Sequence, residues 1–202
     1  MIYCLSGEVI IADALTNTAV IDCAGVGYKV NATGSAISHL LSKGEGAKVR
    51  VFTYMAVRED AVELYGFKTE NELSTFKILI SVSGVGPKAG LSILNTLSPE
   101  ELAIAIAGGD TKSISRAPGI GKRTAERIIL ELKDKLAKGL PDGGDTPGGV
   151  SVTTAAKGNL ADARDALLVL GYTKAETDNA LKGADKSMST EDIIRFALAK
   201  LM

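Results

Sequence analysis

Two short glycine-containing stretches constrain this chain more than any other feature. The first is Gly84-Val85-Gly86-Pro87-Lys88 and the second is Gly119-Ile120-Gly121-Lys122-Arg123. Both have a glycine, a β-branched residue, a second glycine and then one or two cations, and both are followed by apolar residues at helical spacing. An apolar segment also precedes each stretch. The pattern predicts a helix, a tight hairpin and a second helix, occurring twice.

The backbone of such a hairpin predicts an anion site. Glycine adopts positive φ without strain and lets another backbone approach closely. A hairpin that opens a helix presents unpaired N–H groups at the positive end of the helix dipole, where a phosphate binds well. The cations add full charges, and Val85 and Ile120 are expected to point inward and anchor the loops. The predicted phosphate-binding residues are Gly84, Val85, Gly86, Lys88, Gly119, Ile120, Gly121, Lys122 and Arg123.

Two other phosphate-binding motifs are excluded. A P-loop needs a glycine where this chain has Arg116, and a hydroxyl residue where it has Arg123. The dinucleotide fingerprint is met only loosely by the first stretch. Glu100 and Glu101 would then have to end a second strand, but they follow Ser98-Pro99, which is typical of a helix start.

Composition sets the broad class. The chain has 202 residues, few aromatic residues and no Trp, so its cores must be built from Ala, Val, Ile and Leu. Cys4 and Cys23 form no metal or redox motif and are expected in strands. The start has no signal-peptide layout, and no apolar run approaches ~18 residues. We therefore expect a cytoplasmic protein with no membrane segment, cofactor or metal.

Charge is distributed unevenly behind a formal net charge of −1. By sequence count, residues 1–67 carry a net −2, residues 68–138 a net +3 and residues 139–202 a net −2. The positive excess is confined to the segment that contains both hairpins. This distribution favours a protein that binds nucleic acid at one defined site over one that binds it through a general excess of positive charge.

The chain order predicts a multidomain α+β protein. Residues 1–67 show five strand-like segments and one helix, which fits a small closed barrel of the oligonucleotide/oligosaccharide-binding type (OB-fold), with a bulge expected at Gly27. Residues 68–139 are expected to form an all-α tandem helix-hairpin-helix domain. Thr69 and Glu72 match a capping box at the start of its first helix.

The C-terminal part divides into a tether and a small bundle. Residues 140–159 are rich in Gly and Pro and predict a flexible linker. Residues 160–202 predict a three-helix bundle of the ubiquitin-associated (UBA) type, with Thr173 as an N-cap and Glu176 three residues on. Three residues of this bundle are candidates either for its core or for an exposed partner-binding patch. They are Leu167 and Leu170, for which the core is favoured, and Tyr172, which stays open.

A charged tip, Arg58-Glu59-Asp60, lies between the last two expected strands. From the residues alone it is either a solvated polar turn or a charged probe that repels phosphates, and the polar turn is the simpler interpretation.

The order of these parts resembles the RuvA family of Holliday junction branch migration proteins over nearly the whole chain. The segments that carry the resemblance are Gly25-Val26-Gly27-Tyr28, Val57-Arg58-Glu59-Asp60-Ala61, Leu64-Tyr65-Gly66-Phe67, Gly84-Val85-Gly86-Pro87-Lys88 and Pro118-Gly119-Ile120-Gly121-Lys122 continuing to Thr124-Ala125-Glu126-Arg127. The linker matches only in composition.

The resemblance implies a function and a set of partners. Proteins of this family bind four-way DNA junctions as homotetramers, or as octamers on DNA, in recombination and repair. Paired hairpins grip the sugar-phosphate backbone of each arm, and the matched motif extends this role to Arg127. An acidic pin faces the crossover; here it would be Glu59 and Asp60, which favours the phosphate-repelling interpretation of the tip. The C-terminal module engages the hexameric RuvB ATPase, and the RuvC resolvase is a further expected partner. Such a chain is a non-catalytic subunit.

Two competing hypotheses come from other classes. A helix-hairpin-helix junction nuclease or other repair enzyme would need clustered carboxylates for Mg²⁺, and only Glu59, Asp60 and Glu63 are dense enough near the barrel. The single histidine, His39, fits a partly exposed helix residue better than a catalytic base. The other hypothesis is an interaction scaffold whose hairpins are only helix turns, but it leaves the clustered cations unexplained.

Overall fold

The computed structural model describes residues 1–137, 159–169, 172–185 and 188–201. Their contacts group into two compact units: unit 1 comprises Met1–Ile80 and Val85–Thr96, and unit 2 comprises Ser81–Gly84 and Leu97–Met202. The predicted linker, residues 140–159, lies outside the described residues except for Asn159. The predicted domain limits stay a prediction. Within the described ranges, no helix is long and apolar enough to cross a membrane.

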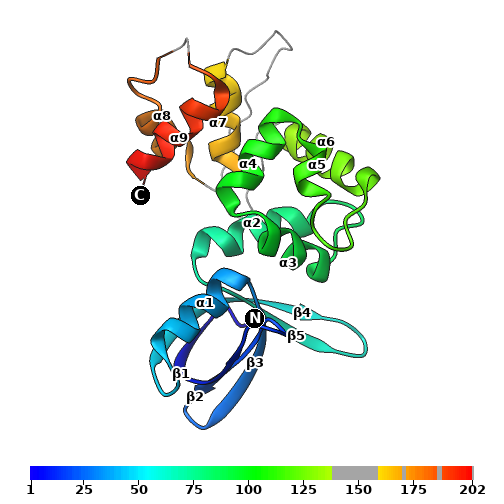
Figure 1. Ribbon diagram of the computed structural model, residues 1–202, viewed down its shortest axis with the longest axis vertical. Helices are drawn as coiled ribbons and strands as arrows, with labels where there is room; N and C mark the ends of the chain where they lie inside the picture. The colour runs from blue at the N-terminus through cyan, green and yellow to red at the C-terminus, as the bar shows by residue number, and fades with distance from the viewer. Residues whose placement is uncertain (138–158, 170–171, 186–187, 202) are drawn as a thin grey trace. The chain divides into compact units, whose positions relative to one another are not determined.

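Unit 1 is a closed five-stranded barrel followed by two helices (Figure 1). The strands are ordered β1-β2-β3-β5-β4 around the barrel; only the β3–β5 pair is parallel. This confirms the predicted OB-type barrel. The elements are β1 (Cys4–Asp13), β2 (Thr18–Cys23), β3 (Val26–Ala32), α1 (Gly34–Lys43), β4 (Lys48–Val57), β5 (Val62–Phe67), α2 (Glu70–Ile80) and α3 (Pro87–Thr96).

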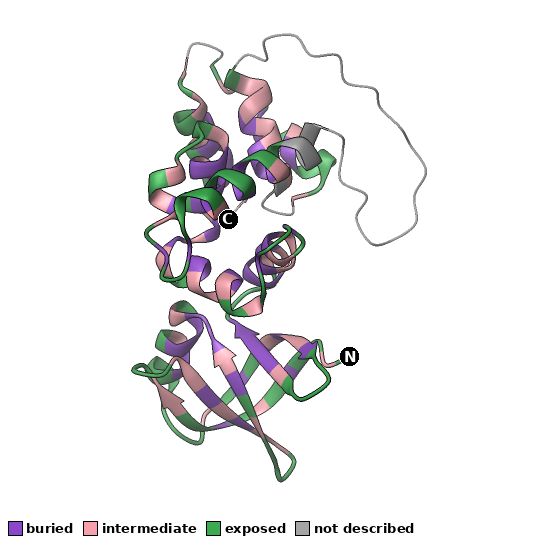
Figure 2. Ribbon diagram, turned by 90° about the vertical axis from the view of Figure 1, so that its right-hand side faces the viewer, coloured by how far each residue is buried: buried purple, intermediate pink, exposed green. Residues whose placement is uncertain are grey.

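The barrel interior is filled by small and branched apolar side chains, as the composition requires. Ala19, Ile21 and Val30 are fully buried, and α1 adds Ile37 and Leu40 to the same core. Figure 2 shows the buried residues on the strands and on α1. Buried positions alternate with more exposed ones along much of β2 and β4, which sets the face that closes inward, whereas the last four residues of β5 are all buried.

The predicted bulge lies at a different place. The register shift is in β1, between Val9 and Ile11, whereas Gly27 pairs regularly with Asp22. Glycine is required at another point of β1: a Cβ on Gly7 would lie only 1.9 Å from the carbonyl oxygen of Asp22. The backbones of β1 and β2 approach so closely there that no side chain fits.

Helix α2 packs on the barrel through aromatic contacts. Phe76 is fully buried, and its ring centroid lies 4.8 Å from Phe67, 5.4 Å from Tyr54 and 5.6 Å from Tyr65. A Cβ on Gly90 of α3 would lie 3.1 Å from both Phe76 and Ile80, so α3 packs closely against α2. The few aromatic residues of the chain are concentrated where the barrel meets the first helical pair.

Glu72 provides a polar link across the same interface. As predicted, the Thr69 hydroxyl accepts a hydrogen bond from the Glu72 N–H (3.2 Å). The Glu72 carboxylate, however, does not complete a capping box at Thr69. It accepts from the Thr33 hydroxyl (2.9 Å), the Ser35 hydroxyl (2.5 Å) and the Lys68 N–H (3.0 Å), and Glu72 is buried. Glu72 thereby joins α2 to the start of α1.

Unit 2 is helical. Its elements are α4 (Pro99–Gly108), α5 (Thr111–Ile114), α6 (Lys122–Ala137), α7 (Asn159–Val169), α8 (Lys174–Ala180) and α9 (Thr190–Leu201). Ser98 with Glu101 and Thr173 with Glu176 form full capping boxes; the second was predicted. Helices α7, α8 and α9 share one apolar core, to which Ala103 of α4 also belongs. The predicted three-helix module is confirmed.

Replacing Glu72 by Ala is expected to lower the free energy of unfolding by about 2–4 kcal/mol, because the buried Thr33 hydroxyl and two further donors would lose their acceptor. Urea unfolding followed by circular dichroism measures this change. The matched surface variant Glu45→Ala should stay within about 0.5 kcal/mol of the parent. A Glu72→Ala protein as stable as Glu45→Ala would contradict the assigned role.

Candidate nucleic-acid interface

The first hairpin, residues 81–86, joins α2 to α3. Gly84 has φ +85°, a backbone conformation that side-chain-bearing residues adopt with strain. Val82 and Val85 are buried, so the loop is held from within, as predicted for Val85. Gly86 is exposed, and a Cβ built on it would meet no atom within 4 Å. The outer side of this hairpin is therefore open to a ligand.

The second hairpin repeats this geometry. Gly119 has φ +82°, Ile120 is buried, and Gly121 is exposed with open space around it. The Ile120 N–H donates to the carbonyl oxygen of Ala117 (3.0 Å), so Ile120 anchors the loop through both its side chain and its backbone. The predicted twofold occurrence of one hairpin geometry is thus visible in the backbone.

The two following helices also begin alike. The first helical bond of α3 runs from the Gly90 N–H to the Gly86 oxygen (2.9 Å), and that of α6 from the Ala125 N–H to the Gly121 oxygen (3.0 Å). The preceding N–H groups, at Lys88 and Ala89 and at residues 122–124, are not used by these helical bonds. Each hairpin therefore directs backbone donors and the positive end of a helix toward its open side.

Cations lie beside both helix ends. Lys88, Lys122 and Arg123 are exposed. Lys122 Nζ lies 3.9 Å from Glu126 Oε1 in an ion pair that is largely exposed, and such pairs contribute little free energy. A phosphate can therefore displace Glu126 from Lys122 at low cost.

Helix α6 also holds the first hairpin. Arg127 donates to the carbonyl oxygen of Ser83 (Nη1 to O, 3.3 Å), and the Ser83 N–H donates to Glu131 (N to Oε2, 3.2 Å). A Cβ on Gly84 would lie 3.5 Å from Arg127 Nη1. Sequence reasoning assigned Arg127 only by resemblance and missed Ser83 and Glu131. The sequence gives no signal for these contacts, because Ser83 takes part only through its backbone N–H and C=O groups.

Asp110 fixes the turn that leads to the second hairpin. Its carboxylate accepts from the N–H groups of Lys112 (3.0 Å) and Ser113 (3.1 Å) at the start of α5. The hydrogen bond from the Ser113 hydroxyl, together with the backbone bonds, lowers the pKa of Asp110. Asp110 therefore stays ionised and caps α5 at neutral pH.

The acidic tip lies at the end of the β4–β5 hairpin, which projects from the barrel in Figure 1. The Arg58 N–H donates to the Ala61 oxygen (2.8 Å) and closes the turn, leaving Glu59 and Asp60 exposed. The Arg58 guanidinium lies 3.7 Å from Glu63. Since Arg58 is paired with Glu63 on β5, the end of the turn presents two carboxylates.

The oxygen of Glu63 that faces Arg58 has a second partner. The Tyr65 hydroxyl donates to Glu63 Oε2 (3.0 Å), and burial together with this bond raises the pKa of Tyr65 to about 12. Glu63 is therefore held along the strand. Among the described residues, no group of three or more His, Cys, Asp or Glu side chains is arranged to hold a metal ion. The nuclease hypothesis, which needed Glu59, Asp60 and Glu63 together, gains no support. His39 is half-buried on α1.

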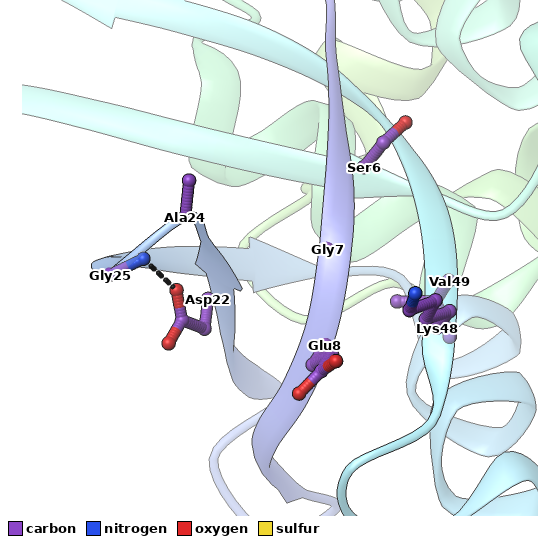
Figure 3. A pocket seen from close by; sticks show the side chains of 8 residues that line it. All are labelled: Ser6, Gly7, Glu8, Asp22, Ala24, Gly25, Lys48 and Val49. Atoms are coloured by element: carbon purple, nitrogen blue, oxygen red, sulfur yellow. Dashed lines mark hydrogen bonds between the residues drawn. The ribbon is translucent and has the colours of Figure 1, made fainter.

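A separate hollow of about 460 Å³ lies on the barrel, where β1 passes the β2–β3 turn and β4 (Figure 3). Asp22 accepts from the Gly25 N–H (2.6 Å) at this turn. The side chains of Glu8, Asp22 and Lys48 line the hollow, so it mixes both signs of charge and lacks the cationic character of a phosphate site.

The three candidate partner-binding residues of the C-terminal bundle differ in exposure. Leu167 is fully buried in the core, and Leu170 lies outside the described residues. Tyr172 is half-buried; burial, followed by the nearby carboxylates Glu100 and Glu176, raises its pKa. Of the two described residues, Tyr172 is the one with surface available to a partner.

Three family profiles match consecutive parts of the chain. One described as "RuvA N terminal domain" matches residues 1–66, one described as "SAM-like Helix-hairpin-helix tandem" matches residues 76–134, and one described as "RuvA, C-terminal domain" matches residues 158–202. Both hairpins and the C-terminal bundle each lie within one of these matches, and the barrel does so except for Phe67 at its end.

Curated relatives match along almost their whole length. The chain is 43% identical to a protein of Symbiobacterium thermophilum, with 100% of this chain and 98% of the relative covered. It is 47% identical to a protein of Thermoanaerobacter sp. (96% of each) and 44% identical to one of Acetivibrio thermocellus (90% of each). All three are named "Holliday junction branch migration complex subunit RuvA".

Proposed function

The chain belongs to the RuvA family, and from this we propose that it binds four-way (Holliday) DNA junctions by their structure and serves as a subunit of a branch migration complex. The proposed DNA contacts are the two hairpins with their cations: Gly84, Val85, Gly86 and Lys88, and Gly119, Ile120, Gly121, Lys122, Arg123 and Arg127.

The observation that carries this proposal is the matched geometry of the hairpins. Both have a left-handed glycine, a buried β-branched anchor and an exposed second glycine at the start of a helix with adjacent cations. Such loops bind phosphates through backbone amides and carry no base-reading side chains, so binding is independent of sequence. Simple interhelical turns would not need open glycines and cations at equivalent places.

We assign the acidic pin to Glu59 and Asp60. Their exposure, and the pairing of Arg58 with Glu63, leave a negative end on the projecting hairpin. Two carboxylates in contact with a polyanion lower the affinity for DNA. We therefore propose that they select the shape of the DNA that binds. They repel phosphates from the crossover point and disfavour continuous duplex there.

We propose that the protein works as a homotetramer, with octamers on DNA as the larger assembly. Apolar surface on the outside of the barrel supports self-association: Ile10, Ile11 and Val26 are exposed on β1 and β3. A Cβ on Gly27 would lie 3.3 Å from Val20 and 3.9 Å from Ile10, so the glycine lets these apolar side chains pack over the backbone of β3. Exposed apolar patches of this kind mark protein interfaces.

The chain acts without catalysis in this proposal. ATP hydrolysis belongs to the RuvB motor, which the C-terminal bundle engages, with Leu167, Leu170 and Tyr172 as candidate contacts. Because Leu167 is buried, Tyr172 is the first residue to test. The RuvC resolvase is a further proposed partner on the junction, and we propose that the protein works in the cytoplasm.

Replacing Lys88 and Lys122 together by Ala should weaken junction binding and flatten its salt dependence. Each lost phosphate contact reduces the slope of log K against log salt by about 0.9. Fluorescence anisotropy with a synthetic four-way junction at several salt concentrations measures both quantities. Lys43→Ala, an exposed lysine on α1, is the matched control and should change neither. An unaltered slope in the double variant would refute the phosphate contacts.

Neutralising the pin with Glu59→Gln and Asp60→Asn should improve binding to continuous duplex relative to the junction. Removing one like-charge contact at about 4 Å in water is worth about 1 kcal/mol, or roughly fivefold. Competition between labelled junction and duplex measures the ratio. Glu45→Gln, exposed elsewhere on the barrel, should leave the ratio unchanged. An undiminished preference for the junction in the pin variant would count against a repulsive role.

Removing residues 140–202 should leave junction binding intact and abolish branch migration driven by the motor. The hairpins and the barrel all lie within residues 1–139, whereas the proposed motor contacts lie beyond them. Gel-shift titration and a branch migration assay with the motor and ATP separate the two activities. Normal branch migration by the shortened protein would contradict this division of labour.

A further inference from the structure

The two main-chain hydrogen bonds at Ser83 form a clamp between hairpins. Arg127 and Glu131 are four residues apart on α6, so both side chains lie on one helical face. Arg127 donates to the Ser83 carbonyl oxygen, and Glu131 accepts from the N–H of the same residue. Both polar groups of one peptide residue are thus held by one helix. The segment Ser81–Gly84 groups with unit 2, to which α6 belongs.

The same helix begins with the second hairpin. Gly121 supplies the first helical acceptor of α6, and Lys122 and Arg123 follow at its end. One helix therefore carries the second phosphate-binding loop at its start and contacts the entry of the first loop about one and a half to two and a half turns later. Gly84, whose left-handed conformation turns the first loop, directly follows the clamped residue.

We propose that Arg127 and Glu131 are positioning residues that preset the first hairpin against the second, so that the two loops receive one DNA backbone as a pair. This inference rests on the proposed function. The role of Glu131 is the informative one. The negative charge of a carboxylate near bound phosphates opposes binding, so losing that charge should strengthen binding. If removing Glu131 weakens binding instead, the cause is the lost hydrogen bond to Ser83.

The test compares Glu131→Ala with Glu131→Gln in the full-length protein. Glu131→Ala removes the acceptor and should lower junction affinity roughly three- to tenfold, the equivalent of one hydrogen bond. Its salt slope should stay at the parental value, because no phosphate contact is removed. Glu131→Gln keeps an acceptor oxygen for the Ser83 N–H and should bind like the parent. Anisotropy titrations of a four-way junction at several salt concentrations report both quantities.

Two controls isolate the clamp. Ser83→Ala keeps both backbone groups and should bind like the parent. Glu126→Ala removes the same charge from the same helix without touching Ser83, so its affinity should be equal to or higher than that of the parent. If Glu126→Ala weakened binding as much as Glu131→Ala does, the clamp would be overturned. The loss of affinity would then come from removing a negative charge on α6, wherever it lies.

The remaining outcomes are also decisive. If Glu131→Ala binds the junction as tightly as the parent, or more tightly, the clamp is overturned and the proposed function is unaffected. Glu131→Gln that falls as far as Glu131→Ala overturns it too, since the charge and not the bond would matter. A parental protein that fails to bind the junction overturns the proposed function, and the clamp's role in DNA binding with it.

Discussion

The interface depends on one backbone constraint. The chain must reverse direction between two helices and still leave the N-terminus of the second helix exposed. Gly84 and Gly119 achieve this reversal with positive φ, and the buried Val85 and Ile120 hold the loops from inside. Because the anchors point inward, the open sides carry only the second glycines and the first-turn amides. The proposed anion site therefore follows from chain geometry before any charged side chain is considered.

Net charge alone would not have suggested this site. The chain carries a formal net charge of −1, and its acidic tip at Glu59 and Asp60 has the opposite sign to the cations at the hairpins. Exposed charges act over about 8–10 Å at physiological salt, so local arrangement matters more than the total. In the proposed function, cations at the loops attract the DNA backbone, and the anionic tip restricts which shape of DNA fits.

Local sequence patterns predicted much of the fold, but they could not predict polar contacts between residues that are far apart in the sequence. The hairpin repeat, the barrel and the Thr173–Glu176 capping box depend on neighbouring residues, and all three appear in the structure. Glu72 shows the limit: its Thr69 contact is local and was predicted, but its carboxylate binds Thr33 and Ser35, far away in the sequence. The Gly27 bulge was wrong for a related reason. Its glycine serves close packing against Val20, and the register shift occurs in β1.

The placement of the first hairpin explains why a clamp is useful. The chain passes from unit 2 to unit 1 between Gly84 and Val85, within the loop itself. The second half of the loop is fixed by α3, which packs on α2 at Gly90. In the first half Ser83 and Gly84 are exposed, and exposed segments open locally at little cost. The Arg127 side chain donates to the Ser83 carbonyl oxygen, and the Ser83 N–H donates to the Glu131 carboxylate. In the proposed clamp these bonds hold the first half of the loop, and because they use only backbone atoms of Ser83, the identity of that residue is free to vary.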